Sequence, residues 1–286
     1  MRIAIQGEAG SFSHEAALSL HPGADIHSCA VSVEVFESLL SGQVDAAVIP
    51  IENSLAGPVA EHYDLLLSSA VWVERESLLR IRHNLVGAPQ SPGEEHLSLE
   101  ERIGKLQRVY SHPVALAQCR QFFLRHPNLQ STPAYDTAGS VKRLLGSPSG
   151  GQDEAAIASA QAASLYGGEI LAAGIEDNSE NFTRFFVVRR QGEGRLAEDA
   201  DKVSVAFSVE NRPGSLVAAL GVFAESGTNL TKIESRPVHG QPWQYIFYVD
   251  YQLSSPAGPD QALQRLRAHC SMVRELGRYR TAQRPG

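Results

Sequence analysis

Three polar side chains stand directly after an apolar run that has the composition of a buried strand. The run at 47–51 leads into Glu52, Asn53 and Ser54. In α/β sheets, ligands bind beyond the carboxyl ends of the strands, so these groups could face a ligand. Asn53 or Ser54 could instead cap a helix, and the residues taken alone favour that interpretation.

Similar groups of hydroxyl side chains follow other apolar runs. Ser11 and Ser13 lie in the glycine-containing segment 7–13, Ser111 ends the run at 108–111, and Thr137 follows a segment broken by prolines. The loop at 7–13 could bind an anion at a helix N-terminus, but it lacks the glycine spacing of nucleotide-binding loops. Together the loops predict one cleft lined with hydroxyls and amides, suited to a small anionic ligand.

The sharpest run is Asn-Phe-Thr-Arg-Phe at 181–185, just before the apolar segment 185–188. A threonine at the edge of a strand has its hydroxyl fixed by a rigid element, and Arg184 offers a forked donor for a carboxylate. From the residues alone, an ordinary strand start with one solvated arginine is the better explanation. The residues alone therefore do not identify Thr183 and Arg184 as a functional pair.

The elements that must position these groups alternate over the first 190 residues. We expect strands at 2–6, 46–50, 82–87, 108–111 and 185–188, and helices at 13–20, 33–40, 113–125 and 138–145. This order is typical of an α/β domain. The segment 155–166 is either a strand followed by a helix or one buried helix.

The order of elements changes after a polar, acidic stretch at 191–201, which we interpret as a linker. Beyond it the pattern predicts a strand (203–209), a helix (213–225), two strands (230–235 and 244–251), a helix (259–270) and a strand (272–279). This is the βαββαβ order of a ferredoxin-like domain. Pro213 and Pro259 stand at the expected helix starts, where proline is favoured.

Composition excludes several classes of protein. The 286 residues are 43% hydrophobic and 20% charged, with a net charge of −7 and scattered basic residues, so we expect a folded protein that does not bind nucleic acid. The three cysteines form no CxxC pair and are expected to be reduced thiols. No apolar run is long enough to span a membrane and the start lacks a signal-peptide pattern, so we expect no membrane association and a cytoplasmic location.

Five separated motifs resemble those of the prephenate dehydratase family, in that family's order and spacing. They are the segments 7–13, 50–54, 111–113 with 117–119, 135–138 and 181–185. The resemblance implies an α/β catalytic domain (1–190) with two lobes, like a periplasmic binding protein of type II. Lobe 1 would comprise about 1–78 and 170–190, and lobe 2 about 79–169. The resemblance also implies an ACT regulatory domain at 202–286.

The resemblance further implies the reaction, in which prephenate loses CO2 and its ring hydroxyl to give phenylpyruvate. Aromatisation drives this step, so no cofactor is expected. Thr183 would donate a hydrogen bond to the departing hydroxyl, and Glu52 could be the acid if burial raised its pKa. The expected substrate contacts are Ser11, Ser13, Asn53, Ser54, Ser111, Thr137, Asn181, Arg184 and Phe185. Arogenate dehydratase and a non-catalytic amino-acid or solute sensor are the alternatives.

Two further runs resemble the effector-binding signatures of the ACT domain. The implied phenylalanine-binding residues are Pro213, Gly214, Ser215, Leu216, Val217, Asn229, Leu230, Glu234, Ser235, Arg236 and Pro237. Phenylalanine would bind between two such domains, so the expected assembly is a homodimer or tetramer. We therefore expect phenylalanine to inhibit the full chain but not a chain that ends near Arg190.

Overall fold

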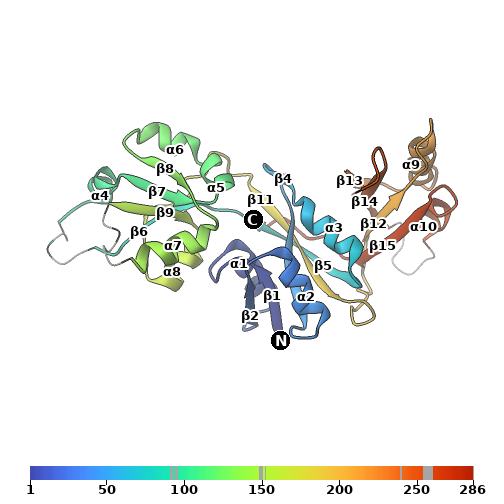
Figure 1. Ribbon diagram of the computed structural model, residues 1–286, viewed down its shortest axis with the longest axis horizontal. Helices are drawn as coiled ribbons and strands as arrows, with labels where there is room; N and C mark the ends of the chain where they lie inside the picture. Colours follow the sequence, from blue (N-terminus) through green and yellow to red (C-terminus); the bar gives the residue numbers. More distant parts are fainter. Residues whose placement is uncertain are drawn as a thin grey trace.

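The computed structural model describes the whole chain except residues 91, 92, 94, 95, 148–150, 152, 239, 254–259 and 286. It has three parts in a row along its long axis (Figure 1). Lobe 2 lies at one end, the C-terminal domain at the other, and lobe 1 between them. The chain therefore has the two lobes and the C-terminal domain that were expected.

Lobe 1 is built on a mixed sheet covered by helices. Its strands are β1 (Arg2–Gln6), β2 (Asp25–Cys29), β3 (Ala46–Asn53), β4 (Gly57–Pro58), β5 (Val71–Arg80) and β11 (Phe182–Arg190), and its helices are α1 (Phe12–Leu20), α2 (Ser32–Leu40) and α3 (Ala60–Ser68). The strand order is β5-β11-β3-β1-β2, and β11 runs antiparallel to both of its neighbours. Residues 46–49 of β3 are fully buried, as expected for a central strand covered on both faces.

Lobe 2 has a second sheet with the order β10-β6-β9-β7-β8. Its strands are β6 (Asn84–Gly87), β7 (Arg108–Ser111), β8 (Gln130–Pro133), β9 (Glu154–Ala158) and β10 (Glu169–Ala172), and its helices are α4 (Leu99–Lys105), α5 (Pro113–Ala117), α6 (Arg120–Arg125), α7 (Thr137–Leu145) and α8 (Ala160–Tyr166). The segment 155–166 is thus a strand followed by a helix. Strand β10 pairs with β6, so the predicted start of the second part of lobe 1 at residue 170 was wrong.

The single helix predicted at 113–125 was also wrong, because the chain forms two short helices there. The carboxylate of Asp177 accepts hydrogen bonds from the backbone N–H groups of Arg120, at 3.0 Å, and Gln121, at 2.8 Å. These bonds start α6 as a new helix, since the first N–H groups of a helix have no partner within it. The break leaves the side chain of Gln118 free to point toward lobe 1.

The C-terminal domain confirms the ferredoxin-like prediction. It contains β12 (Lys202–Ser208), α9 (Ser215–Glu225), β13 (Leu230–Pro237), β14 (Tyr245–Gln252), α10 (Gln261–Leu266) and β15 (Met272–Tyr279), with the strand order β13-β14-β12-β15. The predicted helix start at Pro259 lies outside the described residues. Helix α10 begins at Gln261, and the side chain of Asp260 caps it by accepting a hydrogen bond from Leu263 N.

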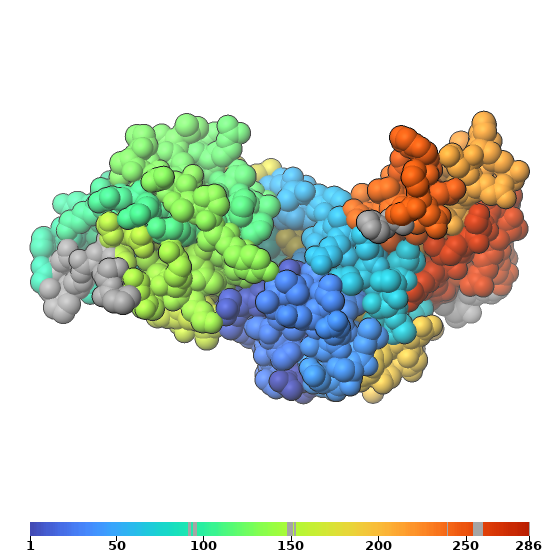
Figure 2. Space-filling view, in the orientation of Figure 1, coloured from blue at the N-terminus to red at the C-terminus, as the bar shows by residue number. Residues whose placement is uncertain are grey.

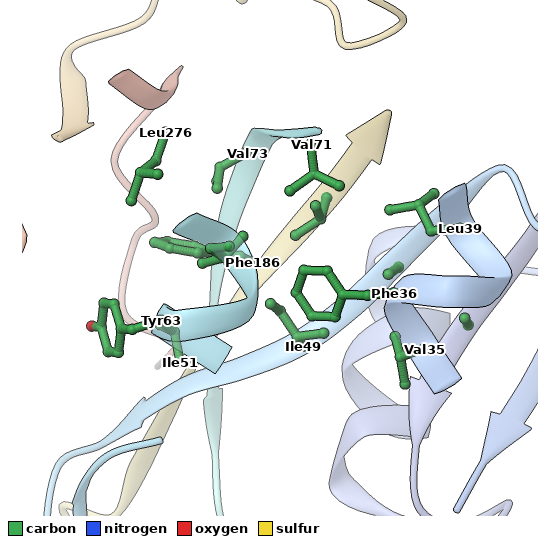
Figure 3. Close-up of a cluster of buried hydrophobic side chains, with 14 of the residues drawn as sticks. Val35, Phe36, Leu39, Ile49, Ile51, Tyr63, Val71, Val73, Phe186 and Leu276 are labelled. Atoms are coloured by element: carbon green, nitrogen blue, oxygen red, sulfur yellow. The ribbon is translucent and has the colours of Figure 1, made fainter. Parts of the chain in front are cut away.

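Lobe 1 and the C-terminal domain share one sheet and one core. Strand β15 pairs with β5 at Gly277 and Val73, which extends the lobe 1 sheet to ten strands. Figure 3 shows Leu276 of the C-terminal domain beside Val73 and Phe186 of lobe 1. This packing fixes the two parts relative to each other.

Each cysteine contributes to a different hydrophobic cluster, as the prediction of core-filling thiols requires. Cys29 lies in the core of lobe 1 and Cys119 in that of lobe 2, while Cys270 packs at the edge of the C-terminal core. All three are free thiols. Burial raises the pKa of Cys270 to about 11.

Candidate active site

A cavity of about 540 Å³ lies between the two lobes. In Figure 2 the surface is hollowed between the green atoms of lobe 2 and the blue atoms of lobe 1. Six of the predicted site residues line it, namely Ser11, Ser13, Asn53, Thr137, Thr183 and Phe185. The predicted cleft therefore exists, and most of its predicted hydroxyl groups are there.

Direct contacts hold the lobes together beside this cavity. The hydroxyl of Ser159 donates to Gly10 O at 2.6 Å, and that of Tyr166 donates to Ala9 O at 2.8 Å. Gly10 has a φ of +87°, and a Cβ atom there would lie 2.8 Å from Cα of Ala162. A glycine at position 10 is thus needed for the two lobes to approach this closely.

Several helix N-termini, with their partial positive charge, face the cavity. The first turns of α1, α3 and α7 all contribute lining residues. The charged side chains of the lining are Glu61 and Asp136, and it contains no Lys or Arg among the described residues. An anionic ligand would therefore be held by backbone N–H groups, hydroxyls and helix dipoles rather than by a cationic side chain.

The hydroxyl hydrogen of Thr183 is free to point into the cavity. Residues Thr183 and Asn53 are register partners on β11 and β3, and Nδ2 of Asn53 lies 3.0 Å from Oγ1 of Thr183. Oδ1 of Asn53 accepts backbone N–H bonds from Leu55, at 3.1 Å, and Ala56, at 2.9 Å. Because a backbone N–H can only donate, these bonds fix the amide orientation. Asn53 therefore donates to Thr183, whose own hydrogen stays available for a ligand.

Asn53 belongs to a ring of three side-chain amides that joins the lobes. Nδ2 of Asn53 donates to Oδ1 of Asn181 at 2.8 Å, and Nδ2 of Asn181 donates to Oε1 of Gln118 at 2.9 Å. Nε2 of Gln118 closes the ring on Oδ1 of Asn53 at 3.3 Å. Asn181 is fully buried and lies outside the cavity lining, so it orients Asn53 instead of contacting a ligand as predicted.

The prediction that Arg184 binds a substrate carboxylate was wrong. Successive side chains of a strand point to opposite faces, so Arg184 lies on the face away from Thr183 and Phe185. Its guanidinium is buried against Glu76, at 2.6 Å, and Asp250, at 2.5 Å. Burial acts to lower the pKa of Arg184, but Asp250, Tyr279 and Glu76 outweigh it and raise the pKa well above its usual value. Arg184 connects lobe 1 to the C-terminal domain.

Glu52 is not the acid that was predicted, for the same geometric reason. Its carboxylate points away from the cavity and lies 2.7 Å from Nζ of Lys232 on β13. Its side chain is 34% exposed, so it has neither the position nor the burial that an acid in the cleft requires. Glu52, like Arg184, contacts the C-terminal domain.

Ser54 and Ser111 also lie outside the cavity lining, which corrects two predicted substrate contacts. The hydroxyl of Ser54 donates to Glu180 O at 2.9 Å and accepts from Phe182 N at 3.0 Å. The hydroxyl of Ser111 is fully buried and donates to Ile157 O at 2.6 Å. Ser54 thus joins the end of β3 to the start of β11, and Ser111 joins the end of β7 to β9.

Several residues that were not predicted line the cavity. Gln118, His112 and Tyr135 belong to motif segments quoted above, so the segments indicated the right loops without indicating these side chains. His83 and Glu61 lie in no such segment, and no pattern in the sequence distinguishes them. Their position follows only from the tertiary fold.

The predicted effector-binding residues lie at the start of α9 and along β13. Strand β13 is at the edge of the ten-stranded sheet, and its residues alternate between exposed and partly buried. Lys232 and Arg236 point toward lobe 1, where Arg236 pairs with Asp64 at 2.6 Å. The same strand therefore carries residues of the predicted effector signature and contacts to lobe 1.

No helix within the described parts of the chain has the length and apolar character needed to cross a membrane.

The fold and the site define a two-lobed α/β protein with an interlobe cavity and a ferredoxin-like C-terminal domain, and comparison with known proteins gives its family. The profile of the family described as "Prephenate dehydratase" matches residues 3–193, and that of the "ACT domain" matches residues 203–270. The chain belongs to the prephenate dehydratase family.

Similar proteins cover nearly the whole chain. "Arogenate dehydratase/prephenate dehydratase 2, chloroplastic" of Arabidopsis thaliana is 38% identical over 98% of this chain and 72% of its own length. The structure of a prephenate dehydratase in complex with L-Phe from Arthrobacter aurescens has a TM-score of 0.82 and 33% identity, over 98% of this chain and 90% of its own. A structure described as GqqA, a quorum quenching acylase, has a TM-score of 0.85 and 31% identity, over 98% of each chain.

Proposed function

We propose that this chain catalyses the decarboxylating dehydration of prephenate to phenylpyruvate, CO2 and water, under feedback control by phenylalanine. The observation that carries the proposal is the orientation of Asn53, which leaves the hydroxyl hydrogen of Thr183 free in the cavity. Membership of the family supports the reaction. The cavity supports a small anionic substrate held by hydroxyl and backbone N–H groups, since its described lining has no Lys or Arg.

The chemistry requires one well-placed hydrogen-bond donor. As the carboxylate on the ring leaves as CO2, its bonding electrons complete the aromatic ring and the C4–O bond breaks. The departing hydroxyl takes up one proton from the medium, so the prephenate dianion and one proton give phenylpyruvate, CO2 and water. A threonine hydroxyl is too weak an acid to lose its proton at neutral pH, so Thr183 stabilises the departing oxygen by donating a hydrogen bond.

The two substrate carboxylates need donors as well. The first turns of α1 and α7 present backbone N–H groups beside Ser11, Ser13 and Thr137. Partial positive charge at helix N-termini stabilises carboxylates. These N-termini would therefore bind the substrate carboxylates in place of Arg184, which faces away from the cavity. We assign Ser11, Ser13, Thr137 and Phe185 to substrate binding.

The test is the change Thr183→Val, which removes the hydroxyl and keeps the shape. We expect kcat for phenylpyruvate formation to fall by at least ~10²-fold with a small change in KM, as for other lost transition-state donors. Thr183→Ser is the matched control, because it keeps the hydroxyl and should keep most of the activity. Near-normal kcat in Thr183→Val would overturn the assignment of Thr183.

Arogenate is the second candidate substrate, and the charge of the cavity favours it. Arogenate carries an ammonium group where prephenate carries a keto group. Glu61 and Asp136 are the carboxylates of the described lining, and no Lys or Arg there opposes an ammonium group. Turnover measured on both substrates with one enzyme preparation decides between them, through the ratio of the two kcat/KM values.

Amide hydrolysis, the reaction of the similar acylase, has no support from the contacts in this cavity. A serine or threonine nucleophile needs a base within hydrogen-bond reach. The hydroxyl of Ser11 accepts a bond from His14 N, and that of Thr183 accepts one from Asn53. In the part of the chain that the structure describes, no histidine ring or carboxylate accepts a hydrogen bond from either hydroxyl, so neither has the base that a nucleophile needs.

The regulatory part of the proposal places phenylalanine between two ACT domains, at the start of α9 and along β13. The exposed apolar side chains of Val217 and Ile233, 75% and 49% exposed, support a partner of the same kind at this edge. A homodimer or tetramer joined through the ACT domains and a cytoplasmic location belong to the same proposal. Sedimentation of the full chain with and without phenylalanine tests the assembly.

A further inference from the structure

The ring formed by Asn53, Asn181 and Gln118 can run in two directions. If all three amides turned over, each hydrogen bond would be kept with donor and acceptor exchanged. The direction matters for the reaction, because the reversed ring would present Oδ1 of Asn53 to Thr183. Thr183 would then donate its hydrogen to Asn53, and no hydrogen would remain for the departing hydroxyl.

The observed direction can be followed atom by atom from the backbone. The N–H groups of Leu55 and Ala56 can only donate, so Asn53 turns its oxygen to them and its NH2 to Asn181. Asn181 in turn donates to Oε1 of Gln118. The oxygen of Gln118 therefore faces Nε2 of His83, which lies 2.8 Å away.

This contact indicates the tautomer of His83. An amide oxygen can only accept, so Nε2 of His83 carries the hydrogen and Nδ1 is unprotonated in the neutral ring. Burial lowers the pKa of His83, which favours the neutral ring. Nδ1 is buried without a hydrogen-bond partner in the part of the chain that the structure describes. A hydrogen on Nδ1 would be a buried donor without an acceptor, so the surroundings of His83 favour Nε2–H whichever way Gln118 is turned.

The ring of His83 is held in place from both lobes. It is 2% exposed and lies edge-on to Phe12 of lobe 1, with the ring centroids 5.6 Å apart. Its backbone N–H donates to Oε2 of Glu176, and its carbonyl accepts from Ile175 N, both at 2.9 Å. The backbone bonds fix the position of His83 where the two chain segments cross between the lobes, and its imidazole is packed against Phe12 with Nε2 directed to Gln118.

We propose that His83, as an Nε2–H donor to Gln118, is a positioning residue that acts together with the backbone N–H groups of Leu55 and Ala56 to set the direction of the amide ring, and so keeps the hydroxyl hydrogen of Thr183 for the substrate. The proposal deepens the proposed function and rests on it for its kinetic effect. His83 acts through Gln118 and Asn53, while Thr183 contacts the reacting atoms. Asn53 orients the ring at one end, and His83 orients it at the other.

The kinetic test compares His83→Phe with His83→Gln in the full chain. Phenylalanine keeps a ring against Phe12 but has no donor, whereas glutamine keeps a side-chain N–H at similar reach. We expect His83→Phe to lower kcat by roughly 10- to 100-fold with little change in KM, the loss typical of a slightly misplaced catalytic group. His83→Gln should stay within about threefold of the unchanged chain. Equal losses in both variants, or none in His83→Phe, would overturn the proposal.

A second measurement needs no substrate and keeps the proposal testable if His83→Phe does not fold. Nitrogen NMR of the unliganded chain, labelled at histidine, distinguishes protonated from unprotonated ring nitrogens. We expect the His83 signals, assigned by their absence in His83→Gln, to show Nε2 protonated and Nδ1 unprotonated at neutral pH. The opposite tautomer would overturn the proposal whatever the enzyme does. Absence of turnover on prephenate and arogenate, with the expected tautomer, would count only against the proposed function.

Discussion

At the scale of the residue, neighbours in the sequence serve different parts of the molecule. Thr183 faces the cavity while Arg184 faces the ACT domain, and Asn53 and Glu52 divide in the same way on β3. The sequence motifs identified these four residues as special, but not their directions. Strand β11 begins at Phe182 and not at 185 as predicted. With the earlier start, the two-residue period of a strand would already have separated Thr183 from Arg184.

The buried histidines predict how stability depends on pH. Burial lowers the pKa of His62 and His83 below the ordinary value of 6.5. The unfolded chain therefore binds protons at a higher pH than the folded chain does. The stabilising contribution of the neutral rings is complete above pH 6.5 and is lost as the pH falls through the lowered pKa values.

We therefore expect the melting temperature of the full chain to decrease as the pH is lowered from about 8 to about 5. The decrease should be smaller for His83→Gln, which has one buried titrating group fewer. Differential scanning calorimetry at constant ionic strength measures both. An unchanged slope in His83→Gln would show that His83 does not titrate differently in the folded and unfolded chains.

At the scale of the element, most strands and helices were predictable because their apolar periods are local. The exceptions depend on distant partners. Asp177 breaks the helix predicted at 113–125, and pairing with β6 assigns β10 to lobe 2. The join between β5 and β15 is of the same kind, since no local pattern indicates that two domains share a sheet.

Gly277 makes that join possible. A Cβ atom at position 277 would lie 2.3 Å from Val73 O, which is closer than any side chain can approach. We expect Gly277→Ala to destabilise the chain by about 1–3 kcal/mol, as overpacking typically does, and to weaken inhibition by phenylalanine while kcat without effector stays within about twofold. Thermal unfolding and an inhibition curve measure the two effects.

Gly221 provides the matched control for this change. It lies in α9, and a Cβ atom there would meet nothing within 4 Å. Gly221→Ala should leave stability unchanged or raise it by up to ~1 kcal/mol, since alanine favours the helix. If both alanine variants weaken inhibition equally, the sheet junction does not transmit the effector signal.

At the scale of the whole molecule, the catalytic and regulatory domains are not separable units. Ala206, Tyr248, Leu276 and Tyr279 of the ACT domain lie in the same core cluster as lobe 1. A chain ending near Arg190 would expose that core and leave Arg184 without Asp250. The sequence analysis expected phenylalanine to inhibit the full chain but not this shortened chain. In that comparison, loss of regulation could not be distinguished from loss of stability, so single substitutions are the better test.

The buried ionic cluster around Arg184 offers such a substitution. Arg184 and Lys202 pair with Glu76 and Asp250, so two positive charges balance two negative ones between the domains. Nη2 of Arg184 also donates to the hydroxyl of Tyr279 at 2.9 Å, from the residue next to Thr183. A shift of β15 relative to β11 would therefore move the backbone that positions the hydroxyl of Thr183.

Removing that hydroxyl by Tyr279→Phe alters the contact without unbalancing the charges. We expect a loss of about 1–3 kcal/mol in the free energy of unfolding, because a buried donor of Arg184 loses its partner. Tyr251→Phe is the control, since its hydroxyl is also buried in the ACT domain but donates to Asp260 of the same domain, at 2.5 Å. Phenylalanine inhibition of prephenate turnover should weaken severalfold in Tyr279→Phe, with kcat nearly unchanged, and stay normal in Tyr251→Phe. Equal weakening in both variants would mean that ACT stability, and not the contact with Arg184, governs the inhibition.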